Sequence, residues 1–84
     1  MDLFELSKLL GNNIHIEYNH ETDLFVSRLE GVCTLNKPMA QIYGVGACRK
    51  DSLINFLDVI RGIELFGNKN RVKVPQDISL PSGL

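Results

Sequence analysis

The stretch Met39–Gly62, MAQIYGVGACRKDSLINFLDVIRG, indicates a strand, a Gly-x-Gly turn and an amphipathic helix in succession. Its first half is mostly apolar and includes the β-formers Tyr43 and Val45, which favours a strand covered on one face. Gly44 and Gly46 interrupt this run, and glycine allows both a sharp turn and a close approach of neighbouring backbone. The segment therefore predicts a strand that leads directly into a helix.

The second half of this stretch predicts a helix that begins near Cys48 or Arg49. Apolar residues recur at the spacing that places them on one side of a helix: Leu53, Phe56, Leu57 and Ile60, with Ile54 and Val59 expected to widen the stripe. Gly62 fits the position after a helix end. Cys48 is a weak N-cap residue, and with Asp51 it forms only a degraded version of the capping-box spacing.

The residues before this stretch predict a short helix followed by two strands. Asp2 and Glu5 have capping-box spacing, and leucines within Asp2–Leu10 fall on one side of a helix that Gly11 would end. Such a short helix is unstable alone and needs a surface to pack on. Residues 14–18 alternate between apolar and polar side chains, residues 24–29 form a second strand, and the polar residues between them favour a hairpin.

The residues after the long helix predict a short return. Residues 63–66 are either a strand or a last helical turn. Gly67–Asn70 is a strong turn signal. Residues 71–74 alternate between basic and apolar side chains, and Pro75 ends this pattern. The segment therefore indicates an edge strand that is protected by two cations.

Together these segments predict an α+β fold. It has an N-terminal helix, an antiparallel sheet of three or four strands, one long helix on one face of the sheet, and a short C-terminal strand. Residues 1–75 would form a single domain. Residues 76–84 would form a tail that wraps the surface or is disordered, from which Ile78 and Leu80 could dock. Small sheets leave edges, so a homodimer through an edge strand or the helix face is a further expectation.

Composition limits the classes of function. The 84 residues suffice for one domain with a small core, and a net charge of −1 does not favour strong non-specific binding to nucleic acid. The charge is uneven, at −3 over residues 1–48 and +2 over residues 49–84, which gives either two solvated faces or a bipolar interaction surface. The chain lacks the run of about 18 apolar residues that spans a bilayer and the signature of a secretory signal. We therefore expect a cytoplasmic protein with reduced cysteines and no membrane partner.

Histidines and cysteines raise two further possibilities. A zinc site would need His15, His20, Cys33 and Cys48, but their spacing fits no common zinc motif. Cys48 beside two cations at a helix start could be a reactive thiol, and a small apolar role is the alternative. Gly44-Val45-Gly46 lacks the further residues of a nucleotide-binding loop. We therefore expect no catalytic residues, no metal and no cofactor.

The element order and several residues resemble a known family. The chain is similar to HicB-like antitoxin domains and to a wider group of small phage-encoded proteins with a β-β-β-α order. The resemblance covers about residues 14–75. Its matching residues are Phe25–Leu29 in the second strand, Gly44 and Gly46 in the turn, Asp51–Leu53 with Phe56 and Leu57 in the helix, and Arg71–Pro75 in the return.

The resemblance implies a small non-enzymatic protein of phage or mobile-element origin. Its leading function would be to bind and occlude a host defence or nucleic-acid-processing protein in the host cytoplasm, as anti-CRISPR proteins do. The candidate contacts are an acidic hairpin and two tyrosines: Glu17, Tyr18, Glu21, Asp23, Glu30 and Tyr43.

Three alternatives stay open. One is a HicB-like antitoxin that neutralises a small RNA-cleaving toxin. Another is a module similar to double-stranded RNA-binding domains, which meet phosphates with clustered cations. Its basic face would comprise Arg49, Lys50, Lys69, Arg71 and Lys73. The last is a zinc- or thiol-dependent enzyme.

Overall fold

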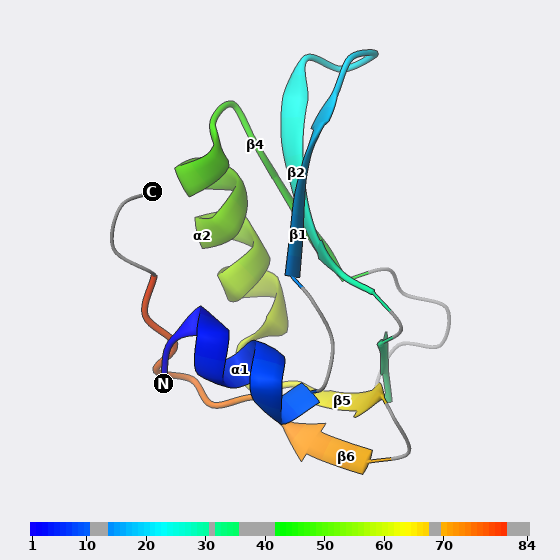
Figure 1. Ribbon diagram of the computed structural model, residues 1–84, viewed down its shortest axis with the longest axis vertical. Helices are drawn as coiled ribbons and strands as arrows, with labels where there is room; N and C mark the ends of the chain where they lie inside the picture. Colours follow the sequence, from blue (N-terminus) through cyan, green and yellow to red (C-terminus); the bar gives the residue numbers. More distant parts are fainter. Residues whose placement is uncertain (11–13, 31, 36–41, 68–69, 81–84) are drawn as a thin grey trace.

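A computed structural model of the chain describes residues 1–10, 14–30, 32–35, 42–67 and 70–80. The elements follow one another in the order shown in Figure 1: α1 (Leu3–Leu10), β1 (Ile14–Asn19), β2 (Leu24–Leu29), β3 (Cys33–Thr34), β4 (Tyr43–Gly46), α2 (Arg49–Ile60), β5 (Glu64–Gly67) and β6 (Asn70–Lys73). The predicted α+β class is confirmed. The predicted helix end at Gly11, the strand start at residues 39–41 and the last tail residues, 81–84, lie outside the described residues.

The first sheet has the antiparallel strand order β1-β2-β4, and α2 lies across one of its faces (Figure 1). Ser27 lies in register with Ile16 on one side and Gly44 on the other. Because side chains alternate between the faces of a sheet, these three positions face α2, and their neighbours along each strand face away from it.

Helix α2 buries the stripe that its sequence predicts. Leu53, Phe56, Leu57 and Ile60 are all at most 1% exposed. The expected widening by Ile54 and Val59 is wrong, because these side chains are 37% and 48% exposed. Each is the sequence neighbour of a stripe residue and therefore points about 100° away from it around the helix. The sheet is narrow, so it covers the stripe but not its flanks.

The two glycines of β4 let α2 approach the strand closely. A Cβ atom at Gly44 would lie 2.6 Å from the carbonyl oxygen of Ser52, and one at Gly46 would lie 2.6 Å from the carbonyl carbon of Asp51. Real side chains do not tolerate such separations, so the helix can occupy this position only above glycine. Neither Gly44 nor Gly46 has a positive φ, so the close approach of the helix is what requires glycine at both positions. Gly62 is different: it lies directly after the C-cap residue of α2, the position predicted from the sequence, and has a φ of 73°.

The last strands form a separate sheet. Residues 64–67 are the strand β5, which pairs antiparallel with both β3 and β6 in the order β3-β5-β6. The strand predicted after the Gly67–Asn70 turn is confirmed, but it belongs to this second sheet rather than to the sheet beneath α2. Leu65 is fully buried and lies opposite the half-buried Val72, so one face of the second sheet also contributes to the core.

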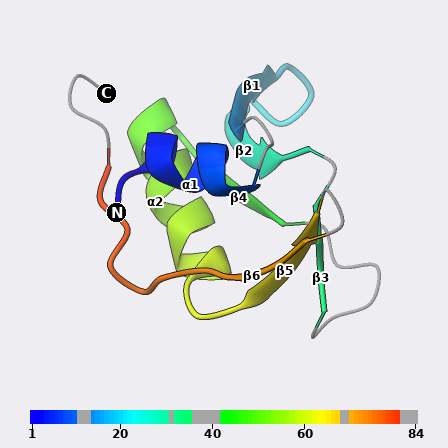
Figure 2. The same cartoon turned by 60° about the horizontal axis from the view of Figure 1, so that its bottom comes forward.

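The segment that follows β6, residues 74–80, runs back to the start of the chain and packs beside Met1 and Asp2 (Figures 1 and 2). Glu5 N–H donates to Asp2 Oδ1 at 2.9 Å, and Asp2 N–H donates to Glu5 Oε2 at 3.4 Å, which confirms the predicted capping box of α1. Leu6 of α1 and Ile78 of the tail both belong to the core, and Leu80 packs against it. The tail is therefore docked through the two residues that the sequence offered for this. Asp2 and Ser79 form a parallel β-bridge, which fixes the tail beside the start of α1.

Candidate functional site

The candidate site is the face of the β1-β2-β4 sheet that points away from α2, named here the open face. A hollow of about 1120 Å³ lies over it and over the tip of the β1-β2 hairpin. Its lining combines carboxylates, apolar side chains and one guanidinium. The lining residues are Glu17, Tyr18, Asn19, His20, Glu21, Thr22, Leu24, Val26, Arg28, Leu29, Glu30, Val32, Ile42, Tyr43 and Val45.

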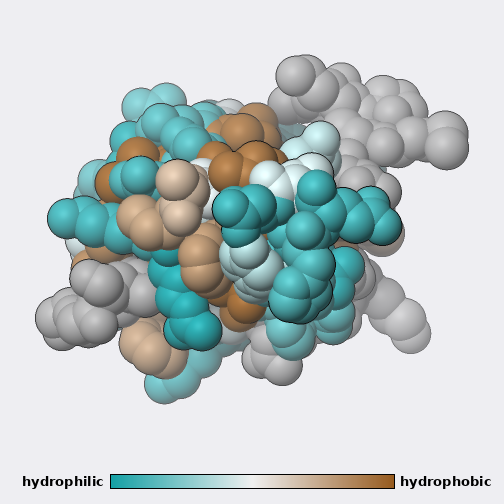
Figure 3. Space-filling view, turned by 90° about the horizontal axis from the view of Figure 1, so that it is seen from above, coloured by the Kyte–Doolittle hydropathy of each residue, from teal (hydrophilic) through white to brown (hydrophobic). Residues whose placement is uncertain are grey.

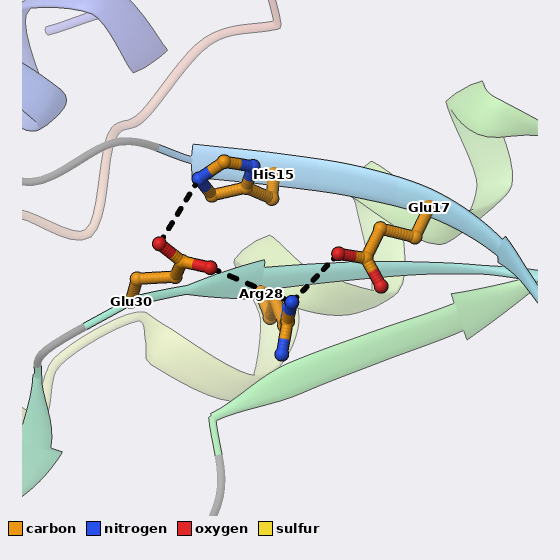
Figure 4. Close-up of polar contacts among 4 residues, drawn as sticks. All are labelled: His15, Glu17, Arg28 and Glu30. Atoms are coloured by element: carbon orange, nitrogen blue, oxygen red, sulfur yellow. Dashed lines mark hydrogen bonds and ion pairs between the residues drawn. The ribbon is translucent and has the colours of Figure 1, made fainter.

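Four charged or titratable side chains form a linked cluster at one side of the open face (Figure 4). Arg28 lies opposite His15 across the β1-β2 pair. The Arg28 Nη2 atom is 2.6 Å from Glu17 Oε1 and 3.5 Å from Glu30 Oε1, and His15 Nε2 is 3.3 Å from Glu30 Oε2. These side chains are 39–55% exposed, so their pairing orients them on the surface and adds little to stability.

The middle of the open face is apolar. Val26 and Val45 lie opposite each other in neighbouring strands, and Tyr43, which lies opposite Arg28, is 47% exposed. Figure 3 looks at the end of the molecule where the β1-β2 hairpin lies and shows hydrophobic areas beside a group of hydrophilic side chains. A partner on the open face would therefore meet an apolar patch with a charged border.

The hairpin tip has its own set of contacts. The Tyr18 hydroxyl donates to Asp23 Oδ1, and the Tyr18 ring makes edge contacts with the rings of His20 and Phe25 at centroid distances of 4.9 and 5.2 Å. Asp23 has a φ of 58°, a turn conformation that aspartate adopts more readily than most residues. The Asp23 carboxylate thus already has a partner, and its role is to shape the turn.

The structure brings together most of the predicted partner-binding residues. Glu17, Tyr18, Glu21, Glu30 and Tyr43 line the hollow, whereas Asp23 does not. The predicted acidic hairpin is also less uniform than its sequence suggests. Two of its carboxylates, Glu17 and Glu30, flank Arg28, which partly neutralises them.

The predicted basic face is divided between two places. Arg49 and Lys50 lie in the first turn of α2, and Arg71 and Lys73 lie on β6, which is at the other end of the molecule (Figure 1). Lys73 also lies directly opposite Glu64 in the second sheet. Lys69 lies outside the described residues. The four described cations therefore do not form one continuous surface.

The candidate metal and thiol residues are also separated. His15 is bound to Glu30, His20 lies against Tyr18, and the Cys48 sulfur accepts a hydrogen bond from Asp51 N–H at 3.5 Å. The side chain of Cys33 is outside the described part of the structure. Within that part, no group of three or more histidine, cysteine, aspartate or glutamate side chains is arranged so that it could hold a metal ion. None of the described helices is long and apolar enough to cross a membrane.

Sequence reasoning missed the part of the site that depends on strand register. Arg28 was not among the predicted site residues, although its guanidinium connects two of them. In a strand, every second residue lies on the same face, so Leu24, Val26 and Arg28 share one face of β2. The three consecutive apolar residues Leu24, Phe25 and Val26 obscured this pattern in the sequence. Comparisons with known protein families, curated proteins and solved structures gave no match to this chain.

Proposed function

We propose that the chain is a small non-enzymatic inhibitor that binds a partner protein through the open face and blocks it by occlusion. The hollow over the open face is the observation that carries this proposal. It is broad, open to solvent and partly apolar, which suits a protein segment better than a small molecule, because small-molecule sites usually enclose their ligand. Aromatic and arginine side chains such as Tyr43 and Arg28 are also frequent in protein interfaces.

The charge of the hollow favours a basic partner surface. Three carboxylates, those of Glu17, Glu21 and Glu30, line it together with the single guanidinium of Arg28. Charge complementarity of this kind raises association rates and excludes partners of the wrong charge. Proteins that handle nucleic acid commonly present basic surfaces. An acidic hollow that covers such a surface would compete with the nucleic acid for it.

The resemblance to small phage-encoded proteins supports a phage or mobile-element origin and a host defence or nucleic-acid-processing protein as the partner, in the manner of anti-CRISPR proteins. A HicB-like antitoxin role is the second candidate, since an acidic open face also suits a small basic RNA-cleaving toxin. The RNA-binding alternative has less support, because the four described cations of the predicted basic face lie at two ends of the molecule.

Affinity capture with matched variants tests this function. The immobilised chain is incubated with nuclease-treated bacterial extract, and the retained proteins are quantified by mass spectrometry. We expect one protein in near-equal amount with the wild type, and at least about tenfold less of it with Tyr43→Lys, which places a cation on the acidic open face. Ile54→Lys, an equivalent change at an exposed apolar residue of α2, is the control and should retain it.

The outcomes separate the candidates. The identity of the retained protein distinguishes a defence or nucleic-acid-processing target from a toxin. Equal retention by the wild type and Tyr43→Lys would exclude the open face as the interface. A parallel capture from untreated extract serves as the comparison, and material that is retained there but lost after nuclease treatment would favour the RNA-binding alternative instead.

A further inference from the structure

Strand β1 is an exposed sheet edge that lacks the usual protection. In the order β1-β2-β4, β2 is the only described strand that pairs with it, so alternate residues along its other side direct backbone N–H and C=O groups outward. It is six residues long and contains no proline, glycine or lysine. The other three described edges differ, and one of them, β3, is only two residues long. Strand β6 carries Arg71 and Lys73, and the Val45 carbonyl of the short strand β4 accepts a hydrogen bond from Asn55 Nδ2 at 2.5 Å.

The sequence of β1 is complementary to itself when it is reversed about Ile16. In an antiparallel pair of two copies centred on this residue, Ile14 lies opposite Tyr18, and His15 lies opposite Glu17. Apolar residues thus meet on the side of α2, and residues of opposite charge meet on the open face when the histidine is protonated. We infer that the chain forms a homodimer by antiparallel pairing of β1 with β1 of a second copy, centred on Ile16.

This register also joins the charged clusters of the two copies. Within one copy, Arg28 contacts Glu17, and His15 contacts Glu30 (Figure 4). In the dimer, Glu17 of one copy lies opposite His15 of the other. A row of four side chains therefore crosses the interface: Arg28 and Glu17 of the first copy, then His15 and Glu30 of the second. When His15 is protonated, the charges alternate in sign along this row, and the twofold axis creates the row twice.

Neighbouring registers lose the pairing of His15 with Glu17, although apolar residues can still lie opposite each other. An axis at Glu17 would set the two Glu17 carboxylates directly opposite each other, and an axis at His15 would do the same for two imidazoles. Like charges in directly opposite positions destabilise a strand pair. A register shifted by one residue would set Ile16 opposite His15 or Glu17 and would place the two α2 helices on opposite faces of the joined sheet. No twofold axis normal to the sheet relates two copies in that register. The axis at Ile16 is therefore the one that a second copy fits.

Single-cysteine variants test the register directly. In a background with Cys33→Ser and Cys48→Ser, Ile16→Cys should form a disulfide-linked dimer under mild oxidation, because directly opposite Cα atoms are about 4.5–5.5 Å apart, within disulfide range. His15→Cys alone and Glu17→Cys alone should not cross-link, whereas a mixture of these two variants should. The mixed pair serves as the test if Ile16→Cys does not fold, since residues 15 and 17 face solvent.

Sedimentation equilibrium of the native chain provides the second test. We expect a monomer–dimer equilibrium, and Glu17→Lys should raise its dissociation constant about tenfold or more, because the change reverses two cross-strand pairs in each dimer. Glu21→Lys is the matched control with the same charge change in the turn outside β1, and it should leave dimerisation unchanged. A monomer at every concentration, cross-linking of Glu17→Cys with itself, or an equal effect of both lysine variants would overturn the inference.

Discussion

Cys48 begins α2 with a sulfur atom where most helices place an oxygen. Its backbone has the extended conformation of an N-cap residue, with φ at −139° and ψ at 170°. Its side chain accepts the hydrogen bond from Asp51 N–H, but at 3.5 Å and through a weak acceptor. Cys48 thus has the backbone conformation of an N-cap residue, but its side chain is a weaker hydrogen-bond acceptor than the oxygen of serine or aspartate. The degraded capping-box spacing in the sequence indicates the same weakness.

Replacement of this sulfur by oxygen should stabilise the protein. Cys48→Ser provides a stronger acceptor at the same position, and we expect the free energy of unfolding to rise by about 0.5–1 kcal/mol. Cys48→Ala removes the acceptor and should fall a few tenths of a kcal/mol below the wild type. Urea midpoints of the three proteins measure the order. Equal midpoints for the serine and alanine variants would mean that the cap bond contributes nothing.

At the scale of elements, two consecutive buried hydrogen bonds join α2 to the sheet. Ser52 Oγ donates to the Gly44 carbonyl at 2.9 Å, and Ser27 Oγ lies 2.6 Å from Ser52 Oγ, with both serines fully buried. Because Ser52 has one hydroxyl proton and Gly44 accepts it, Ser27 must donate to Ser52. The two small side chains and the glycine form one packed layer between the helix and the strands.

The donor direction of these two hydrogen bonds predicts that alanine at position 52 and alanine at position 27 have unequal effects on stability. Ser52→Ala leaves the buried Ser27 hydroxyl without its acceptor and should destabilise the fold by about 1–3 kcal/mol. Ser27→Ala removes only the terminal donor, so Ser52 keeps its bond to Gly44, and the loss should be smaller. Urea denaturation of both variants and of the double variant gives their coupling energy. A larger loss for Ser27→Ala would contradict the assigned direction.

The elements differ in how far their sequence predicts them. Local patterns sufficed for the stripe of α2, the capping box of α1 and the alternation around Arg71. The second sheet was missed because β3 has two residues and its pairing with Phe66 and Leu65 joins distant parts of the chain. Arg28 was missed for a related reason, since its bond to Glu17 depends on the β1-β2 register. The burial of Ser52 follows from contact with glycine, which no hydrophobic pattern reveals.

At the scale of the whole molecule, residues 77–79 are bonded to the first residue of the chain. Ser79 N–H donates to the Met1 carbonyl at 2.9 Å, and the Met1 ammonium is 3.5 Å from the Asp77 carbonyl oxygen. Ile78 between them is 4% exposed and belongs to the core. The tail therefore completes the hydrophobic core beside α1 and α2.

Shortening the chain tests this role of the tail. A variant that ends after Pro75 loses Ile78 and the bonds to Met1, and its free energy of unfolding should fall by about 2–5 kcal/mol, as for removal of a large core side chain. A chain that ends after Leu80 retains these contacts and is the control. Urea midpoints compare the two. Equal midpoints would show that the tail covers the surface without adding stability.

The bridge between Asp2 and Ser79 has a consequence for the order of events during synthesis. Ribosomes make proteins from the N-terminus, so α1 emerges long before the residues that hold its start in place. Until those residues have been made, the start of α1 lacks its bridge to Ser79. The β1-β2 hairpin can form early from neighbouring residues, whereas the core closes only when the tail arrives. The newly made chain can thus pair β1 with β2, and expose the outer edge of β1, before the residues that complete the core have been made.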